Sequence, residues 1–141
     1  MRKLLFAIAL LLSLNIHAEE DEHEKLPEGI LSFNYETEEF SLKPNVLKNF
    51  SISYAPMNKV GLLIKVTPSS LVRSLDETSI FVHQKGKFRS VIVKVQNSAP
   101  DFYLVSCNEV LEGSEIVNQG TNFLKTIQLA LEEGPSEGHG H

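Results

Sequence analysis

The chain has 141 residues, of which 42% are hydrophobic and 22% charged, values typical of a folded domain and too apolar for a disordered chain. Its single cysteine excludes an internal disulfide framework and a metal site held by several thiolates. The formal net charge of −5 argues against nucleic acid as a partner, because binding phosphates needs clustered Lys and Arg.

The first 18 residues are typical of an export signal. Arg2 and Lys3 provide a positive start, an apolar run follows over 4–14, and Ala18 offers a small residue at the cleavage position. The run is too short to span a bilayer comfortably, so we expect cleavage and an exported mature chain. An uncleaved N-terminal anchor is the alternative. Cleavage would remove two bases and no acid, which changes the formal charge from −5 to −7.

Composition predicts how the mature chain is divided. Residues 19–29 are rich in acids and lack hydrophobic periodicity, which predicts a disordered acidic arm. We expect one domain over 30–134, long enough for a single hydrophobic core. Gly and His dominate 135–141, which we expect to be a flexible tail.

Apolar and polar residues mostly alternate within the predicted domain, which is the period of a strand with one buried face. In the run over 60–66, every second residue from Val60 to Val66 is expected on one face of a single strand. A Gly-bearing loop over 84–87 predicts a hairpin. The expected strands cover 30–35, 50–54, 60–66, 80–83, 88–95, 102–107 and 115–118. Seven or eight short strands predict a mainly β protein, a small antiparallel β-barrel.

One segment has the helical period instead. Between 121 and 133, Phe123, Ile127 and either Ala130 or Leu131 recur on one face, and Leu124 widens this stripe. A Gly-Pro pair directly after this segment is a helix stop. We therefore expect one short C-terminal helix that lies against the sheet.

No catalytic constellation is recognisable, so we expect a protein that is not an enzyme. His83 is the one histidine outside the signal, the arm and the tail, and no acid lies near it in the sequence. We therefore predict a surface imidazole. Cys107 follows Tyr103 and Val105 at strand spacing and is expected to be a small buried hydrophobe rather than a reactive thiol. A small hydrolase is the least favoured class.

Histidines near the two ends form a candidate metal site. His139 and His141 lie in the tail beside the terminal carboxylate, and His23 lies in the acidic arm. Two imidazoles do not complete a tetrahedral zinc site, but imidazole suits Zn²⁺, Ni²⁺ and Cu²⁺. We expect no resident cofactor. Weak capture of these ions is one interpretation of the tail, and a solubilising segment is the other.

A basic group on the predicted hairpin is the candidate docking site. Lys85, Lys87 and Arg89 could contact an acidic partner or anionic lipid headgroups, and a solvated turn explains them equally well. Three tyrosines expected to be exposed complete the candidate docking residues: Tyr35, Tyr54 and Tyr103.

Several segments within about residues 60–141, among them the strand expected over 88–95, resemble a known family. The sequence VTPSSLV over 66–72, followed by TSIFV over 78–82, resembles the "P-x-x-A-L-V … V-F-V" passage of periplasmic adaptor subunits. These membrane fusion proteins belong to tripartite efflux pumps driven by resistance-nodulation-division transporters. The sequence VLEGSEIVNQG over 110–120 resembles their "G-L-x-x-G-E-x-V-V-x-x-G" ending. The FLK over 123–125 and the His-bearing terminus resemble the heavy-metal branch.

The resemblance implies a membrane-proximal domain, a small β-barrel that in adaptors sits against the transporter. It therefore implies a non-enzymatic periplasmic accessory protein of a heavy-metal efflux pump. Its partner would be the inner-membrane transporter or a full-length adaptor. Ser70 departs from the usual Ala, and the mature chain has no room for the lipoyl domain, helical hairpin and second barrel of adaptors. Alternatives are a periplasmic metal-buffering protein and a structural subunit of another envelope complex.

Overall fold

The structure is a computed structural model and describes residues 26–133. The predicted export signal, most of the acidic arm and the Gly/His tail lie outside this range. In chain order the elements are β1 (Ile30–Phe33), β2 (Phe40–Leu42), α2 (Pro44–Asn49), β3 (Ser53–Pro56), β4 (Asn58–Val60), β5 (Leu63–Val66), a 3-10 turn η1 (Pro68–Ser70), β6 (Val72–Arg73), β7 (Thr78–Gln84), β8 (Lys87–Ser98), β9 (Tyr103–Ser106), β10 (Glu115–Gln119) and α3 (Thr121–Glu132).

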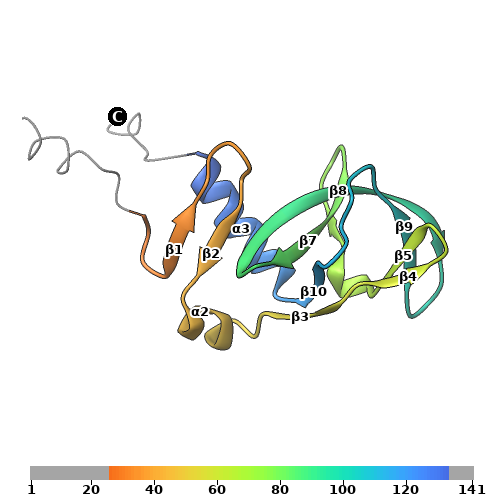
Figure 1. Ribbon diagram of the computed structural model, residues 1–141, viewed down its shortest axis with the longest axis horizontal. Coiled ribbons are helices and arrows are strands. Elements are labelled where there is room, and N and C mark those ends of the chain that lie inside the picture. Colours follow the sequence, from red (N-terminus) through yellow and green to blue (C-terminus); the bar gives the residue numbers. More distant parts are fainter. Residues whose placement is uncertain (1–25, 134–141) are drawn as a thin grey trace, which may run out of the picture.

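The strands form an antiparallel sheet that nearly closes into a barrel (Figure 1). Its main path runs β3-β10-β7-β8-β9-β5-β4, so β3 and β4 are at opposite ends of the path. These two strands are consecutive in the chain and only Met57 separates them. One bent segment therefore pairs with β10 on one side and with β5 on the other. The prediction of a mainly β, barrel-like fold with one C-terminal helix is confirmed.

The sheet buries one apolar cluster on each of its faces. Because successive side chains of a strand point to opposite faces, the run over 80–82 contributes to both clusters. Ile80 and Val82 join the interior cluster with Val91, Val93 and Val105. The outer cluster consists of larger side chains contributed by several elements: Phe40, Phe81, Phe88, Val117, Leu124 and Leu131 are among its buried members.

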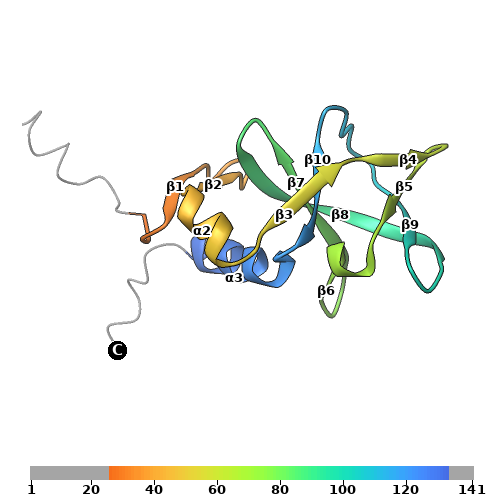
Figure 2. The ribbon, with the colours of Figure 1, turned by 90° about the horizontal axis from the view of Figure 1, so that it is seen from below.

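The outer cluster is covered by the elements from the two ends of the described chain. Phe40 of β2 pairs with Phe88 of β8, which brings the β1–β2 hairpin against the sheet. Figure 2 shows α2 and α3 with this hairpin at one end of the molecule and β4, β5 and β9 at the other. Within 26–133, no helix combines the length and the apolar character needed to cross a membrane.

The start of the packed chain lies before residue 30, where we placed the domain boundary. Gly29 is buried, and its carbonyl accepts a hydrogen bond from the Lys43 N–H at 2.9 Å. Gly29 has a φ of +92°, and a Cβ there would lie 2.8 Å from Cγ2 of Val46. Leu26 packs against the outer cluster. Residues 26–29, which we assigned to the arm, are thus in contact with the domain.

The prediction of one strand over 60–66 is wrong. This segment belongs to a hairpin formed by β4 and β5. The chain turns at Gly61, where φ is +65°. Leu62 at the turn is 99% exposed and Val60 is 47% exposed, so neither shares the buried face of Ile64. The alternation of apolar residues continues through the turn, so only Gly61 indicates the turn in the sequence. Apolar residues at a hairpin tip follow the period of a strand without being buried in one.

Helix α3 lies where the sequence predicts it and buries part of the predicted stripe. Leu124, Gln128 and Leu131 are buried, whereas Phe123 and Ile127 are half-buried. Ala130 is exposed. Gln128 is tolerated in the buried stripe because its Oε1 accepts a hydrogen bond from Nζ of Lys125 at 3.4 Å. The sheet therefore contacts the Leu124 side of the predicted stripe, and Phe123 and Ile127 lie at the edge of that contact.

Candidate docking surface

The β9–β10 loop, residues 107–114, is held between two hairpins. Glu112 makes the connection to both of them. Its backbone carbonyl accepts a hydrogen bond from Nε2 of Gln84 at 3.4 Å, at the β7–β8 turn. Its carboxylate lies 4.0 Å from Nζ of Lys59 on β4. We call the surface formed by the β7–β8 turn (84–87), the β4–β5 hairpin (58–66) and this loop the loop face.

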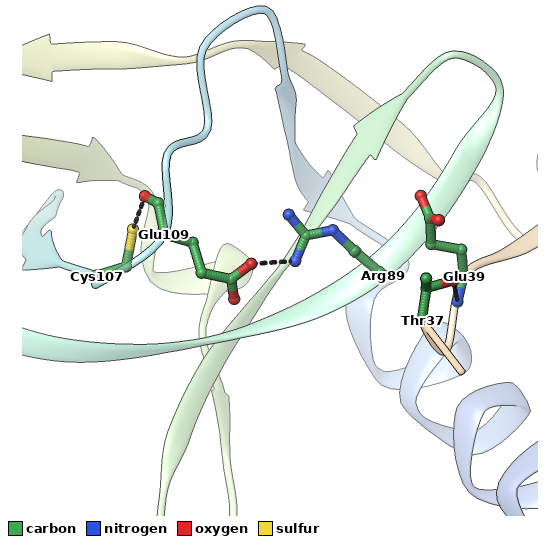
Figure 3. A network of polar contacts seen from close by, with 5 residues as sticks. All are labelled: Thr37, Glu39, Arg89, Cys107 and Glu109. Atoms are coloured by element: carbon green, nitrogen blue, oxygen red, sulfur yellow. Dashed lines mark hydrogen bonds and ion pairs between the residues drawn. The ribbon is translucent and has the colours of Figure 1, made fainter. Parts of the chain in front are cut away.

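A second set of contacts ties the start of the loop to β8 (Figure 3). Nη1 of Arg89 lies 2.6 Å from Oε1 of Glu109, with side-chain exposures of 24% and 48%. The Cys107 thiol donates to the Glu109 carbonyl at 3.3 Å. Cys107 packs against the interior cluster as a small hydrophobe, but it is half-buried and not fully buried as predicted. The turn between β1 and β2 lies on the other side of Arg89 in this view, where the Glu39 N–H donates to Oγ1 of Thr37.

The three basic residues predicted for docking differ in their environments. Arg89 is engaged by Glu109, so it orders the loop. Lys85 and Lys87 are exposed, and within 26–133 neither forms an ion pair. Lys85 and Gly86 both have positive φ values, +53° and +78°, as a two-residue type I′ turn requires. The turn therefore presents two lysines to the solvent from a defined backbone.

Exposed aliphatic side chains accompany these charges. Val110 is 86% exposed, although the next residue, Leu111, is 4% exposed and packs in the interior cluster. Leu111 and the contacts of Glu109 and Glu112 therefore hold the backbone that presents Val110. On the neighbouring hairpin, Leu62 is also exposed. The loop face thus combines apolar side chains with unpaired lysines on an ordered framework.

The structure corrects the prediction that His83 is a surface imidazole. Its side chain is only 12% exposed, and Nδ1 lies 3.1 Å from Oε1 of Glu115. The imidazole stacks on the Tyr54 ring, with 3.9 Å between centroids and 18° between planes. It also packs against Phe88, with 4.7 Å between the ring centroids. The acid that the local sequence lacks comes from β10, whose Glu115 pairs with His83 across the sheet.

Of the three tyrosines expected to be exposed, only one is. Tyr35 is 54% exposed, and its ring lies 4.6 Å from that of Phe33. Tyr54 is half-buried in its stack with His83. Tyr103 is half-buried on β9, where the Arg73 guanidinium lies 5.5 Å from its ring centroid. Tyr54 and Tyr103 therefore stabilise the fold more than they offer a contact surface.

The candidate metal ligands His139, His141 and His23 lie outside the described residues. Among residues 26–133, no three His, Cys, Asp or Glu side chains are grouped so as to hold a metal ion. No family model matches the chain, and comparison with curated proteins and solved structures also gave no match. The resemblance to adaptor subunits therefore stays a prediction that rests on the motifs.

Two of the segments that carry this resemblance, 66–72 and 110–120, contact each other. Oγ of Ser69 in η1 donates to the Asn118 carbonyl of β10 at 2.6 Å. Oγ1 of Thr121 donates to the Ser69 carbonyl at 2.9 Å. Between them, Gly120 adopts a φ of +84° as the N-cap of α3. These contacts form the junction of β10, η1 and α3, whereas residues 110–114 of the second motif lie in the loop face at the other end of β10.

Proposed function

We propose that this chain is a non-enzymatic periplasmic protein accessory to a heavy-metal efflux pump. It docks through the loop face on the inner-membrane resistance-nodulation-division transporter or on a full-length adaptor subunit. The barrel-like fold is the kind that the adaptor resemblance implies. The observation that carries the docking mode is the ordered β9–β10 loop, which exposes 86% of Val110 between two anchored glutamates.

An ordered loop with an exposed aliphatic side chain suits docking for two physical reasons. Burying a Val or Leu side chain contributes about 1.5–3 kcal/mol, and a few such anchors dominate most protein interfaces. Because Leu111 packs in the interior cluster and Glu109 contacts Arg89, the loop is already held and little conformational entropy is lost when a partner binds. Val110 therefore provides an anchor on a surface that needs little reorganisation.

The lysines of the loop face favour a partner with a complementary charge. Lys85 and Lys87 are exposed at the type I′ turn, next to the loop. Unpaired surface charges change the association rate and its salt dependence more than the final affinity. We expect the docking site on the partner to combine an apolar depression for Val110 with carboxylates that face the two lysines.

Co-purification from a membrane extract tests the proposal. Tagged mature chain is incubated with detergent-solubilised inner membrane from its own organism, and retained proteins are identified by mass spectrometry. We expect recovery of a resistance-nodulation-division transporter or a full-length adaptor. Val110→Asp should lower that recovery by about tenfold, since a desolvated charge replaces the anchor. Leu75→Asp is the matched control, because Leu75 is fully exposed on the β6–β7 turn, outside the loop face.

The outcomes test the proposed function and the proposed docking surface separately. If neither a transporter nor an adaptor is recovered, the proposed function is wrong. If one is recovered and Val110→Asp and Leu75→Asp behave alike, the loop face is not the docking surface. Thermal unfolding of both variants should match that of the parent chain, because both positions are exposed and make no core contact.

A further inference from the structure

An apolar groove of about 260 Å³ lies between α2, α3 and the segment that leads into β1. Val46 and Phe50 line it from α2 and its C-terminal end, and Ile30 lines it from β1. Phe123, Ile127 and Ala130 line it from α3. Figure 2 shows α2 and α3 next to each other at this end of the molecule. The groove involves none of the elements of the loop face.

The α3 wall of the groove is an apolar stripe without a covering element in the described chain. Phe123, Ile127 and Ala130 follow the i, i+4, i+7 spacing of one helix face. The sheet contacts a neighbouring stripe, in which Leu124 and Leu131 are buried. The Phe123 ring stacks on Phe50 with 3.6 Å between centroids, yet Phe50 is still 50% exposed. The groove is therefore walled by large side chains that are ordered but only partly covered.

Carboxylates are the charged groups among the lining residues and at the α3 end of the groove, and we call them the acidic rim; α2 carries Lys48 in its last turn. Glu28 lines it, and no lysine or arginine does. Glu132 and Glu133 are exposed and follow Leu131, another lining residue. The last turn of α3 carries no basic residue, so the partial negative charge of the helix C-terminus is not neutralised there. The apolar groove thus opens next to an electronegative end.

We propose that this groove binds a cationic amphipathic helix of a partner protein. Its apolar face would place side chains at i, i+3 or i+4, and i+7 between α2 and α3, a common mode of helix-in-groove recognition. An engineered apolar cavity of about 150 Å³ holds one benzene molecule, so 260 Å³ accommodates more than one large side chain. Lysines or arginines flanking that apolar face would meet Glu28 and the acidic end of α3.

The acidic rim selects this occupant over two others. An anionic membrane surface would be repelled by the carboxylates that attract lysine. A second copy of the chain would bring its own acidic rim against this one, and like charges in contact disfavour binding. The inference does not depend on the proposed efflux function, because it rests on different residues and a different kind of partner.

Peptide binding tests the proposal directly. The probe is a fluorescent peptide of about 15 residues, with leucines on one helix face and lysines elsewhere. A second probe keeps the leucines and replaces every lysine by glutamate. We expect saturable binding of the lysine peptide to the mature chain, followed by anisotropy, and binding of the glutamate peptide at least about tenfold weaker. Raising the salt concentration should weaken binding of the lysine peptide, because salt screens the exposed charges of the rim.

Two substitutions on the same helix provide the matched pair. Ala130→Phe fills the groove from an exposed position and should weaken binding of the lysine peptide by about tenfold. Leu129→Phe changes an exposed residue that does not line the groove and should leave binding unchanged. Glu28→Gln removes one rim charge and should weaken binding by about two- to threefold, without affecting folding.

Several results would overturn the proposal. Equal affinity for both peptides would show that the rim does not select charge. Equal effects of Ala130→Phe and Leu129→Phe, with both variants unfolding at the parent temperature, would place binding elsewhere. Retention of the chain on vesicles of anionic lipid, with no binding of the lysine peptide, would identify a membrane surface instead.

Discussion

At the junction of β10 and α3, one glycine is required by conformation and by space together. Gly120 has a φ of +84°, a region that disfavours residues with a Cβ. A Cβ there would lie 2.7 Å from Cγ1 and 3.1 Å from Cα of Ile52. The backbone atom of Ile52 cannot move away as a flexible side chain would. The close approach of Ile52 therefore explains why this chain has a glycine, and no side-chain cap, at the start of α3.

We predict that Gly120→Ala lowers the free energy of unfolding by about 2–4 kcal/mol, since backbone strain and a steric clash combine. Gly61→Ala is the control, because φ is +65° there and nothing lies within 4 Å of the added Cβ. It should cost about 1 kcal/mol, from the positive φ alone. Urea denaturation measures both values. Equal losses for the two variants would show that contact with Ile52 contributes nothing.

His83 tests whether the aromatic stack on Tyr54 or the polar contact with Glu115 contributes more to the stability of this cluster. The imidazole is stacked on Tyr54, while Glu115 is 38% exposed, so solvent weakens the polar contact more than the stack. His83→Ala should lower the free energy of unfolding by about 1–3 kcal/mol. His83→Phe keeps a ring and should lose less than about 1 kcal/mol. Chemical denaturation measures both variants. Similar losses in the free energy of unfolding for His83→Ala and His83→Phe would assign the stability to the Glu115 contact.

Among the elements, α3 shows that periodicity identifies a helix but does not decide which side of it is buried. The segment is amphipathic, and its helical spacing identified it from residues 121–133. Which stripe meets the sheet depends on the direction in which the chain leaves β10 at Gly120. Thr121 is drawn towards η1 by its hydrogen bond to the Ser69 carbonyl. That contact helps to set the rotation that buries Leu124 and leaves Ala130 outside.

We predict that Leu124→Ala lowers the free energy of unfolding by about 2–5 kcal/mol, because Leu124 is 0% exposed between α3 and the sheet. Leu129→Ala on the same helix should stay within about 0.5 kcal/mol of the parent, since Leu129 is 47% exposed. Thermal unfolding followed by circular dichroism compares the two. A large loss in Leu129→Ala would mean that the helix packs with a different face.

For the molecule as a whole, β7 and β8 belong to both apolar clusters. Ile80 and Val82 face the interior, whereas Phe81 and Phe88 face α3 and β2. Because the same strands hold both layers, unfolding of one layer removes the support of the other. We therefore expect a single cooperative transition for residues 26–133, with no stable barrel left after the outer layer is lost.

The Gly/His tail allows a whole-chain prediction about metal ions. We expect the mature chain to bind Zn²⁺ weakly, because His139 and His141 supply only two imidazoles. Deleting residues 136–141 should abolish the calorimetric signal and leave thermal unfolding unchanged. Binding that survives the deletion would assign the ion to another part of the chain. No signal from the intact chain would remove the metal-buffering alternative.

The sequence by itself determined the local elements of this protein. Period-two alternation and a Gly-bearing loop identified the β7–β8 hairpin, and helical spacing identified α3, because both patterns arise between near neighbours in the chain. The basic turn at Lys85 and Lys87 was found in the same way. The short strands β2, β4 and β6 contain too few residues to show a period, so they were missed.

Only the tertiary structure decided which distant residues meet. Glu115 reaches His83 because β10 pairs with β7, and Glu112 joins two hairpins because the β9–β10 loop passes between them. Barrel closure depends on the bend at Met57, which lets one segment pair with two strands. Such contacts are chosen by the packing of the whole chain. No pattern within a window of neighbouring residues contains them.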